Sequence, residues 1–153
     1  MRYTILSFLF LSFFSNLFTQ PINDDCSGII DLGVAPICPF QDTFHNVNAT
    51  PSTAFSDPIA NLPSCFSGTV DRDVWFQFSV PIDVLDFTVT VTGVDGPNGS
   101  MIQPQIAVYR GDCLLDELVE LNCTTSNAGS NVVTIDLAGL TPNLSYFLRI
   151  NDW

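Results

Sequence analysis

The alternation of apolar and polar residues over positions 74–80 constrains the fold more than any other feature. Valine or phenylalanine occupies every second position there, and tryptophan, glutamine and serine fill the positions between them. Successive side chains of a β-strand point to opposite faces, so this period of two predicts a strand with one face on a core. Pro81 lacks a backbone N–H group, which ends this strand or marks it as an edge.

Other segments repeat this alternation, and turn residues or proline-rich stretches separate them. The further predicted strands are 29–34, 84–92, 105–110, 118–121, 132–137 and 146–150. Clusters of Gly, Asn, Asp and Pro, such as 93–99 and 140–143, are typical of turns. Residues 35–67 hold many prolines and show no helical period, which predicts a long loop region. The pattern predicts an all-β chain folded as an antiparallel β-sandwich.

The first 20 residues have the features of an export signal. Arg2 lies in a short positive start, and residues 5–18 are almost wholly apolar before the chain turns polar at Thr19. An apolar run of this length with these flanks predicts a secretory signal peptide, and an uncleaved membrane anchor is the alternative. We therefore expect a signal peptide over 1–20 and a single domain over 21–153. The mature chain would be secreted or held at the cell surface, without a membrane span.

The charge balance excludes one class of partner. The chain carries 16 Asp and Glu against four cationic residues, all of them arginines, and its formal net charge is −12. Removal of Arg2 with the signal would leave three positive charges. Such a chain repels phosphate backbones, so we expect no nucleic-acid partner. The acidic surface favours divalent cations or simply solubility outside the cell.

The cysteines predict disulfides, because an exported chain meets an oxidising compartment. Cys113 and Cys123 lie at the two ends of one short excursion of the chain, so we expect them to be bonded. Cys38 and Cys65 bracket the long loop region, and a bond between them would tether it. Cys26 is then left without a partner. A zinc site or a cysteine nucleophile would depend on His45, the single histidine, and is not expected.

Several short motifs, taken in order, resemble a module common in exported proteins of Bacteroidetes-type bacteria. They are NDDC at 23–26, PSC at 63–65, DVWFQF at 73–78, VYRGDC at 108–113, LNC at 121–123, GLTP at 139–142 and YFLRI at 146–150. The middle part is also similar to the bacterial pre-peptidase C-terminal domain, a jelly-roll-like β-sandwich. The resemblance implies a non-catalytic accessory module, often one of several in a large surface or secreted protein. We expect an adhesive or accessory role for this chain, with an extracellular glycan or protein as its partner.

The resembling modules close with one more strand that carries a cysteine, whereas this sequence ends at Trp153. On this basis we expect the module to be truncated at its C-terminal strand, with the missing strand supplying the partner of Cys26. The alternative is a complete chain in which Cys26 is free or joined to another molecule.

Two groups of residues are candidate sites. Asn and Asp side chains near the start of the module and before the central strand are the ligand types that calcium prefers. These are Asn23, Asp24, Asp25, Asp71 and Asp73. The alternative is that they form turns and add solubility. Trp75 and Tyr109 lie opposite the core residues of their strands, so they are candidates for stacking on a sugar or protein ligand. The alternative is that Trp75 packs under a loop or into the second layer of the sandwich.

No catalytic arrangement is evident, and we do not expect an enzyme. Carboxylate pairs could be imagined for glycoside hydrolysis, but nothing in the sequence places two of them about a cleft. A Ser–His–Asp site would depend on His45, which lies in a proline-rich loop without a nucleophile elbow. The alternatives to an accessory module are a calcium-stabilised carbohydrate-binding module and a part of a secreted hydrolase.

Overall fold

The computed structural model describes residues 19–35, 43–52, 62–68, 70, 72–84, 86–96, 99–113 and 117–153. The described residues form β-strands joined by turns, with one short 3-10 turn, η1, at Cys26–Gly28. The strands are β1 Ile30–Val34, β2 Val74–Ser79, β3 Phe87–Thr92, β4 Asp95–Gly96, β5 Gly99–Ser100, β6 Pro104–Arg110, β7 Val119–Thr125, β8 Val132–Leu137 and β9 Ser145–Asp152. The prediction of an all-β chain is confirmed, and each predicted strand is present.

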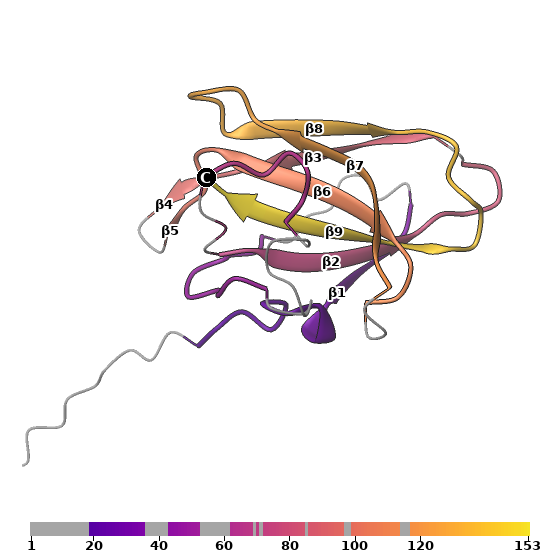
Figure 1. The fold of residues 1–153 in the computed structure, drawn as a ribbon, viewed down its shortest axis with the longest axis horizontal. Coiled ribbons are helices and arrows are strands. Elements are labelled where there is room, and N and C mark those ends of the chain that lie inside the picture. Colours follow the sequence, from indigo (N-terminus) through magenta and orange to yellow (C-terminus); the bar gives the residue numbers. More distant parts are fainter. Residues whose placement is uncertain are drawn as a thin grey trace, which may run out of the picture.

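Five strands form the main sheet in the order β1-β2-β9-β6-β7 (Figure 1). Strands β3 and β8 form a second, two-stranded sheet, and β4 and β5 form a small hairpin within the segment predicted as a turn. The pairs β2–β9, β9–β6 and β6–β7 are antiparallel, but β1 runs parallel to β2. The prediction of a wholly antiparallel arrangement is therefore wrong at β1. A parallel pair needs a long connection, and the proline-rich region between β1 and β2 provides it.

The last strand, β9, occupies the middle of the five-stranded sheet. It pairs with β2 on one side, where Phe76 lies opposite Leu148, and with β6 on the other, where Val108 lies opposite the same leucine. Eight residues long, it extends the predicted strand at both ends. The strand that the sequence marks most clearly, β2, lies beside β9 between it and β1.

One face of the five-stranded sheet packs on β3 and β8 to form the main core. Its buried members from the five-stranded sheet include Phe76, Phe78, Val108 and Leu148. The facing strands contribute the apolar residues of their alternation, so β8 has the strict exposed–buried pattern expected of a half-buried strand. We call this side of the five-stranded sheet the inner face.

Candidate functional site

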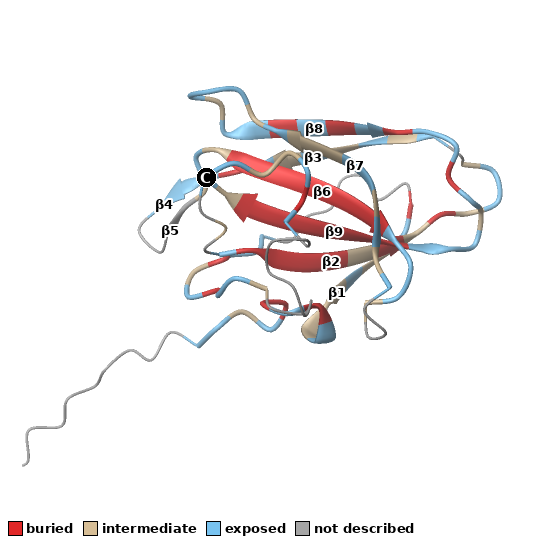
Figure 2. Cartoon of the chain, viewed as in Figure 1, coloured by how far each residue is buried: buried red, intermediate tan, exposed pale blue. Residues whose placement is uncertain are grey.

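The opposite side of the five-stranded sheet, which we call the outer face, is also buried. Consecutive residues of β2, β6 and β9 are buried, so these strands lack a solvent side (Figure 2). The buried residues of the outer face include Trp75, Ala107, Tyr109, Phe147 and Arg149. Its apolar members pack with Cys26 of η1, with Ile29 and with Phe66 of the 62–68 loop. Loops rather than a second sheet therefore cover this face.

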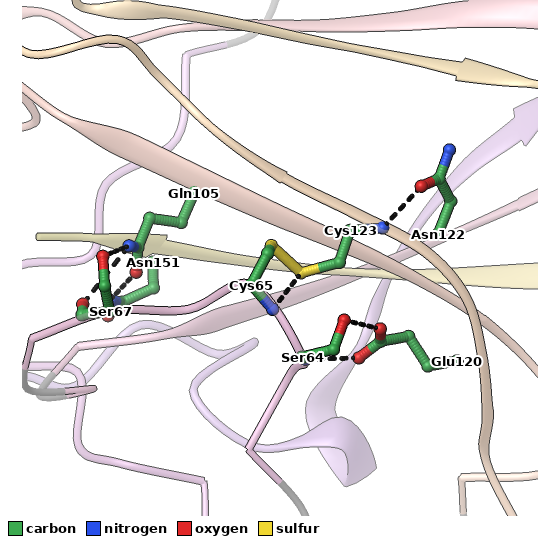
Figure 3. Close-up of a disulfide and its surroundings, with 8 residues drawn as sticks. All are labelled: Ser64, Cys65, Ser67, Gln105, Glu120, Asn122, Cys123 and Asn151. Carbon is green, nitrogen blue, oxygen red and sulfur yellow. Dashed lines mark hydrogen bonds between the residues drawn. A yellow bond between two sulfur atoms is a disulfide. The ribbon is translucent and has the colours of Figure 1, made fainter.

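Two disulfides hold the segments that cover the outer face, which we call the coverings, to the sheet. Cys26 of η1 is bonded to Cys113 beyond the end of β6, with 6.0 Å between the Cα atoms. Cys65 of the 62–68 loop is bonded to Cys123 of β7, with 5.6 Å between the Cα atoms (Figure 3). The bonds join residues 87 and 58 positions apart, so they connect segments that are distant in sequence.

Both predicted cysteine pairings are wrong, and Cys26 is not the unpaired cysteine. The β6–β7 register explains the first error, because Cys123 lies opposite Ala107 rather than opposite Cys113. Cysteines at the ends of a hairpin meet only where the register places them face to face. Cys65 bonds Cys123, which excludes the predicted bond to Cys38; Cys38 itself lies outside the described residues.

Polar contacts add to the disulfide in holding the 62–68 loop (Figure 3). The backbone N–H and the hydroxyl of Ser64 both donate to the carboxylate of Glu120 on β7, the N–H over 2.8 Å. The amide nitrogen of Gln105 donates to the backbone oxygen and hydroxyl of Ser67 at 3.3 and 3.2 Å. The loop is therefore fixed at several points along the sheet.

A buried ion pair lies at the centre of the outer face. Arg149 Nε donates to Asp73 Oδ2 over 2.7 Å, and the two side chains are 2% and 0% exposed. Asp73 Oδ1 accepts the backbone N–H of Ser52 at 2.9 Å, and the Ser52 hydroxyl binds the other carboxylate oxygen. The Arg149 guanidinium lies 5.4 Å from the centre of the Trp75 ring. A buried charge pair is tolerated only when its remaining hydrogen-bonding positions are satisfied, as they are for Asp73.

The predicted calcium residues lie in this same region. Asn23 exchanges two hydrogen bonds with the backbone of Trp75, at 2.9 and 3.0 Å, so it is part of the covering of the sheet. The Asp24 carboxylate accepts hydrogen bonds from the backbone N–H and hydroxyl of Thr50. Burial, together with the carboxylates of Asp24 and Asp73, raises the pKa of Asp25 above its ordinary value.

The structure therefore brings Asn23, Asp24, Asp25 and Asp73 into one neighbourhood, while Asp71 lies outside the described residues. The carboxylates of Asp24 and Asp73 are bound by donors of the protein itself. In the part of the chain that the structure describes, no three His, Cys, Asp or Glu side chains are grouped as a metal site. The calcium site and its alternative, turn formation, both stay predictions, and these protein donors favour the alternative.

The prediction that Trp75 and Tyr109 form an exposed stacking surface is wrong. Their side chains are 0% and 5% exposed, and their ring centres lie 5.7 Å apart beneath the coverings. The alternative, that Trp75 packs under a loop, describes its position. Its indole N–H donates to the Ser52 hydroxyl over 2.6 Å, which satisfies its one polar atom. Burial raises the pKa of the Tyr109 hydroxyl well above its ordinary value.

Two residues that organise this region, Arg149 and Ser52, are not among the predicted site residues. Arg149 carries a signal in the sequence, because it occupies an alternate position of β9 between apolar residues, where an isolated cation needs a buried partner. Ser52 carries no comparable signal. It lies in the proline-rich region, where no periodicity predicts which side chain faces the sheet.

Comparison with protein-family models, curated proteins and solved structures gives no match to this chain. Within the described residues, no helix is long and apolar enough to cross a membrane.

Proposed function

We propose that this chain is a non-catalytic accessory or adhesion module of a larger exported bacterial protein, secreted or held at the cell surface. The observation that carries the proposal is the pair of disulfides that fix the coverings of the outer face. Structural disulfides form and persist in oxidising compartments outside the cytosol. Such bonds suit a module whose role is to keep its shape outside the cell.

The chemistry of the outer face supports the same role. Asp73, Arg149 and Trp75 would be the obvious candidates for binding or catalysis in a cleft, but here they bind one another and Ser52. Their side chains contribute to holding the sheet and its coverings together. These contacts support a scaffold role for the conspicuous polar residues, and we propose that any ligand binds another surface.

Two further features belong to this proposal. Residues 1–20 act as a cleaved signal peptide, as their charge and apolar pattern predict. The five-stranded sheet and the β3–β8 sheet are the two layers of a jelly-roll-like β-sandwich. Support for this comes from the apolar cluster that the two sheets share and from the ordered motifs that resemble pre-peptidase C-terminal domains.

The proposal is tested by expressing the full chain with its first 20 residues in a bacterium that has a periplasm. We expect a mature protein that starts near Pro21 and carries two disulfides. The purified protein is then applied to immobilised extracellular polysaccharides and matrix proteins, with release of cleavage products measured in parallel. Retention without product supports the proposal. Hydrolysis of any of these substrates, retention in the cytosol with reduced cysteines, or a lack of binding to the whole panel would overturn it.

A further inference from the structure

A hollow with a volume of about 330 Å³ lies where β6 ends, between β7 and β8. Arg110, the last residue of β6, lines it together with Leu121 and Asn122 of β7. Asp136 of β8 and the connection from β8 to β9 complete the wall. Its size falls at the lower end of the range for small-molecule sites, which is about 300–1,000 Å³. It is separate from the outer face and uses none of the residues of the buried ion pair.

Hydrogen bonds fix the walls of this hollow. The Asn122 amide nitrogen donates to the backbone oxygen of Asp136 over 3.0 Å, which ties β7 to β8. The Tyr146 hydroxyl accepts the backbone N–H of Thr141 over 2.7 Å and holds the β8–β9 connection in place. The backbone N–H of Gly139 donates to Asp86 over 2.8 Å. A hollow with fixed walls loses little conformational freedom when a ligand binds.

Arg110 is the one cationic residue of the hollow, and its side chain is exposed. Among the described residues it forms no ion pair, although Asp136 lines the same hollow. A guanidinium binds a carboxylate with two parallel hydrogen bonds and is the side chain best suited to that geometry. In a chain with a net charge of −12, an arginine without a carboxylate partner is available to an acidic ligand.

Asp136 limits the kind of acid that fits. Its carboxylate accepts the hydroxyl of Thr88 over 2.7 Å, and it can accept further hydroxyl donors from a ligand. A phosphate or sulfate dianion would be repelled by this carboxylate more strongly than a singly charged acid is. A singly charged acid that also carries hydroxyl groups matches both Arg110 and Asp136. The side chains of Leu121 and Leu140 offer apolar surface to the C–H face of a sugar ring.

We propose that this hollow binds a uronic acid residue of an acidic polysaccharide, with its carboxylate on Arg110 and its hydroxyl groups on Asp136. The inference rests on the proposed function only in that the ligand comes from outside the cell. It adds the chemical class of the ligand and the residue that selects it.

The test is titration of the purified mature protein with trigalacturonate, followed by amide chemical shifts and by calorimetry. Galactotriose, which lacks the carboxylates, is the matched neutral ligand. We expect trigalacturonate to bind and to shift the amides of Leu121 and Gly139. Arg110→Ala should weaken binding about ten-fold or more, and Arg110→Lys should weaken it less. Arg72→Ala is the control, because Arg72 is exposed and lies outside the hollow, and it should bind as the unmodified protein does.

Equal binding of galactotriose, unchanged binding by Arg110→Ala, or no binding of trigalacturonate overturns the inference. A short peptide that competes through its C-terminal carboxylate with equal affinity would overturn it as well. The two proposals can fail separately. Retention of the Arg110→Ala protein on an acidic polysaccharide contradicts this site but leaves the accessory function intact. Cleavage of the polysaccharide with Arg110-dependent binding contradicts the accessory function but leaves this site intact.

Discussion

The two faces of the five-stranded sheet are both buried, but different interactions hold them. The inner face packs Phe76, Phe78 and Leu148 against the apolar side chains of β3 and β8. The outer face holds the Asp73–Arg149 ion pair and is covered by loops that two disulfides bind to the sheet. The inner face needs only apolar residues in the right pattern, because hydrophobic burial is not directional. The buried charges of the outer face need specific hydrogen-bonding partners. We therefore expect the inner face to tolerate conservative substitutions and the outer face to depend on a few named bonds.

Removing both disulfides should have the largest effect on stability. This change also tests the difference between the two faces, because both bonds hold the coverings of the outer face. In the chain-entropy description, closing loops of 58 and 87 residues contributes about 4–5 kcal/mol per bond at most. Replacement of all four bonded cysteines by alanine should therefore lower the free energy of unfolding by several kcal/mol and leave little folded protein at 37 °C. Urea unfolding followed by circular dichroism measures this. Replacement of Cys38 alone is the control and should leave the unfolding midpoint close to that of the unmodified protein.

The next effect in size concerns the buried ion pair. Arg149→Met leaves the carboxylate of Asp73 buried without its cation, and such a change costs about 3–5 kcal/mol. Adding Asp73→Asn should restore part of this loss, because it removes the uncompensated charge. Arg72→Met, at an exposed arginine, should change stability by less than about 0.5 kcal/mol. If Arg149→Met were as mild as Arg72→Met, the ion pair would not be a main support of the outer face.

The contrast between the faces also explains what the sequence could predict. The inner face follows from alternation, so the strands around Phe78, Val108 and Ile135 are correctly predicted. The coverings of the outer face come from the regions around Ser52 and Cys65, where prolines and turn residues carry no periodicity. Which loop residue meets which strand depends on tertiary register, and the wrong cysteine pairings have the same origin. Arg149 was detectable as an isolated cation in an apolar strand, but its partner Asp73 was interpreted as a turn or calcium residue.

A smaller effect concerns Asp25 at the edge of the covering. Its folded-state pKa is raised above the ordinary value of 3.8, so its charged form is disfavoured in the folded protein. The folded state then binds more protons than the unfolded state between the ordinary and the raised pKa. The contribution of Asp25 to the free energy of unfolding therefore falls as the pH rises from the ordinary pKa to the raised pKa. Asp25→Asn should raise the melting temperature slightly at pH 7, and the gain should vanish below about pH 3.5, where both states are protonated. A gain that persists in acid would show that charge is not its cause.

The smallest expected effect is that of a chelator. Protein donors already bind the carboxylates of Asp24 and Asp73, so we expect EDTA to leave the melting temperature unchanged. A ligand at about 100 times its dissociation constant would stabilise the fold by about 2.7 kcal/mol, a shift of several degrees. If chelation lowers the melting temperature by that amount and excess calcium restores it, these residues bind a calcium ion. Asp24→Asn should then abolish the response.

The connectivity of the disulfides tests the central claim most directly, because the coverings of the outer face depend on it. The exported protein is digested without reduction and its linked peptides are identified by mass spectrometry. We predict one linked pair that contains Cys26 and Cys113 and a second that contains Cys65 and Cys123. A bond between Cys113 and Cys123, or between Cys38 and Cys65, would contradict the account. A Cys113–Cys123 bond would leave neither the N-terminal segment nor the 62–68 loop bonded to the sheet as described, and a Cys38–Cys65 bond would leave the loop without its bond.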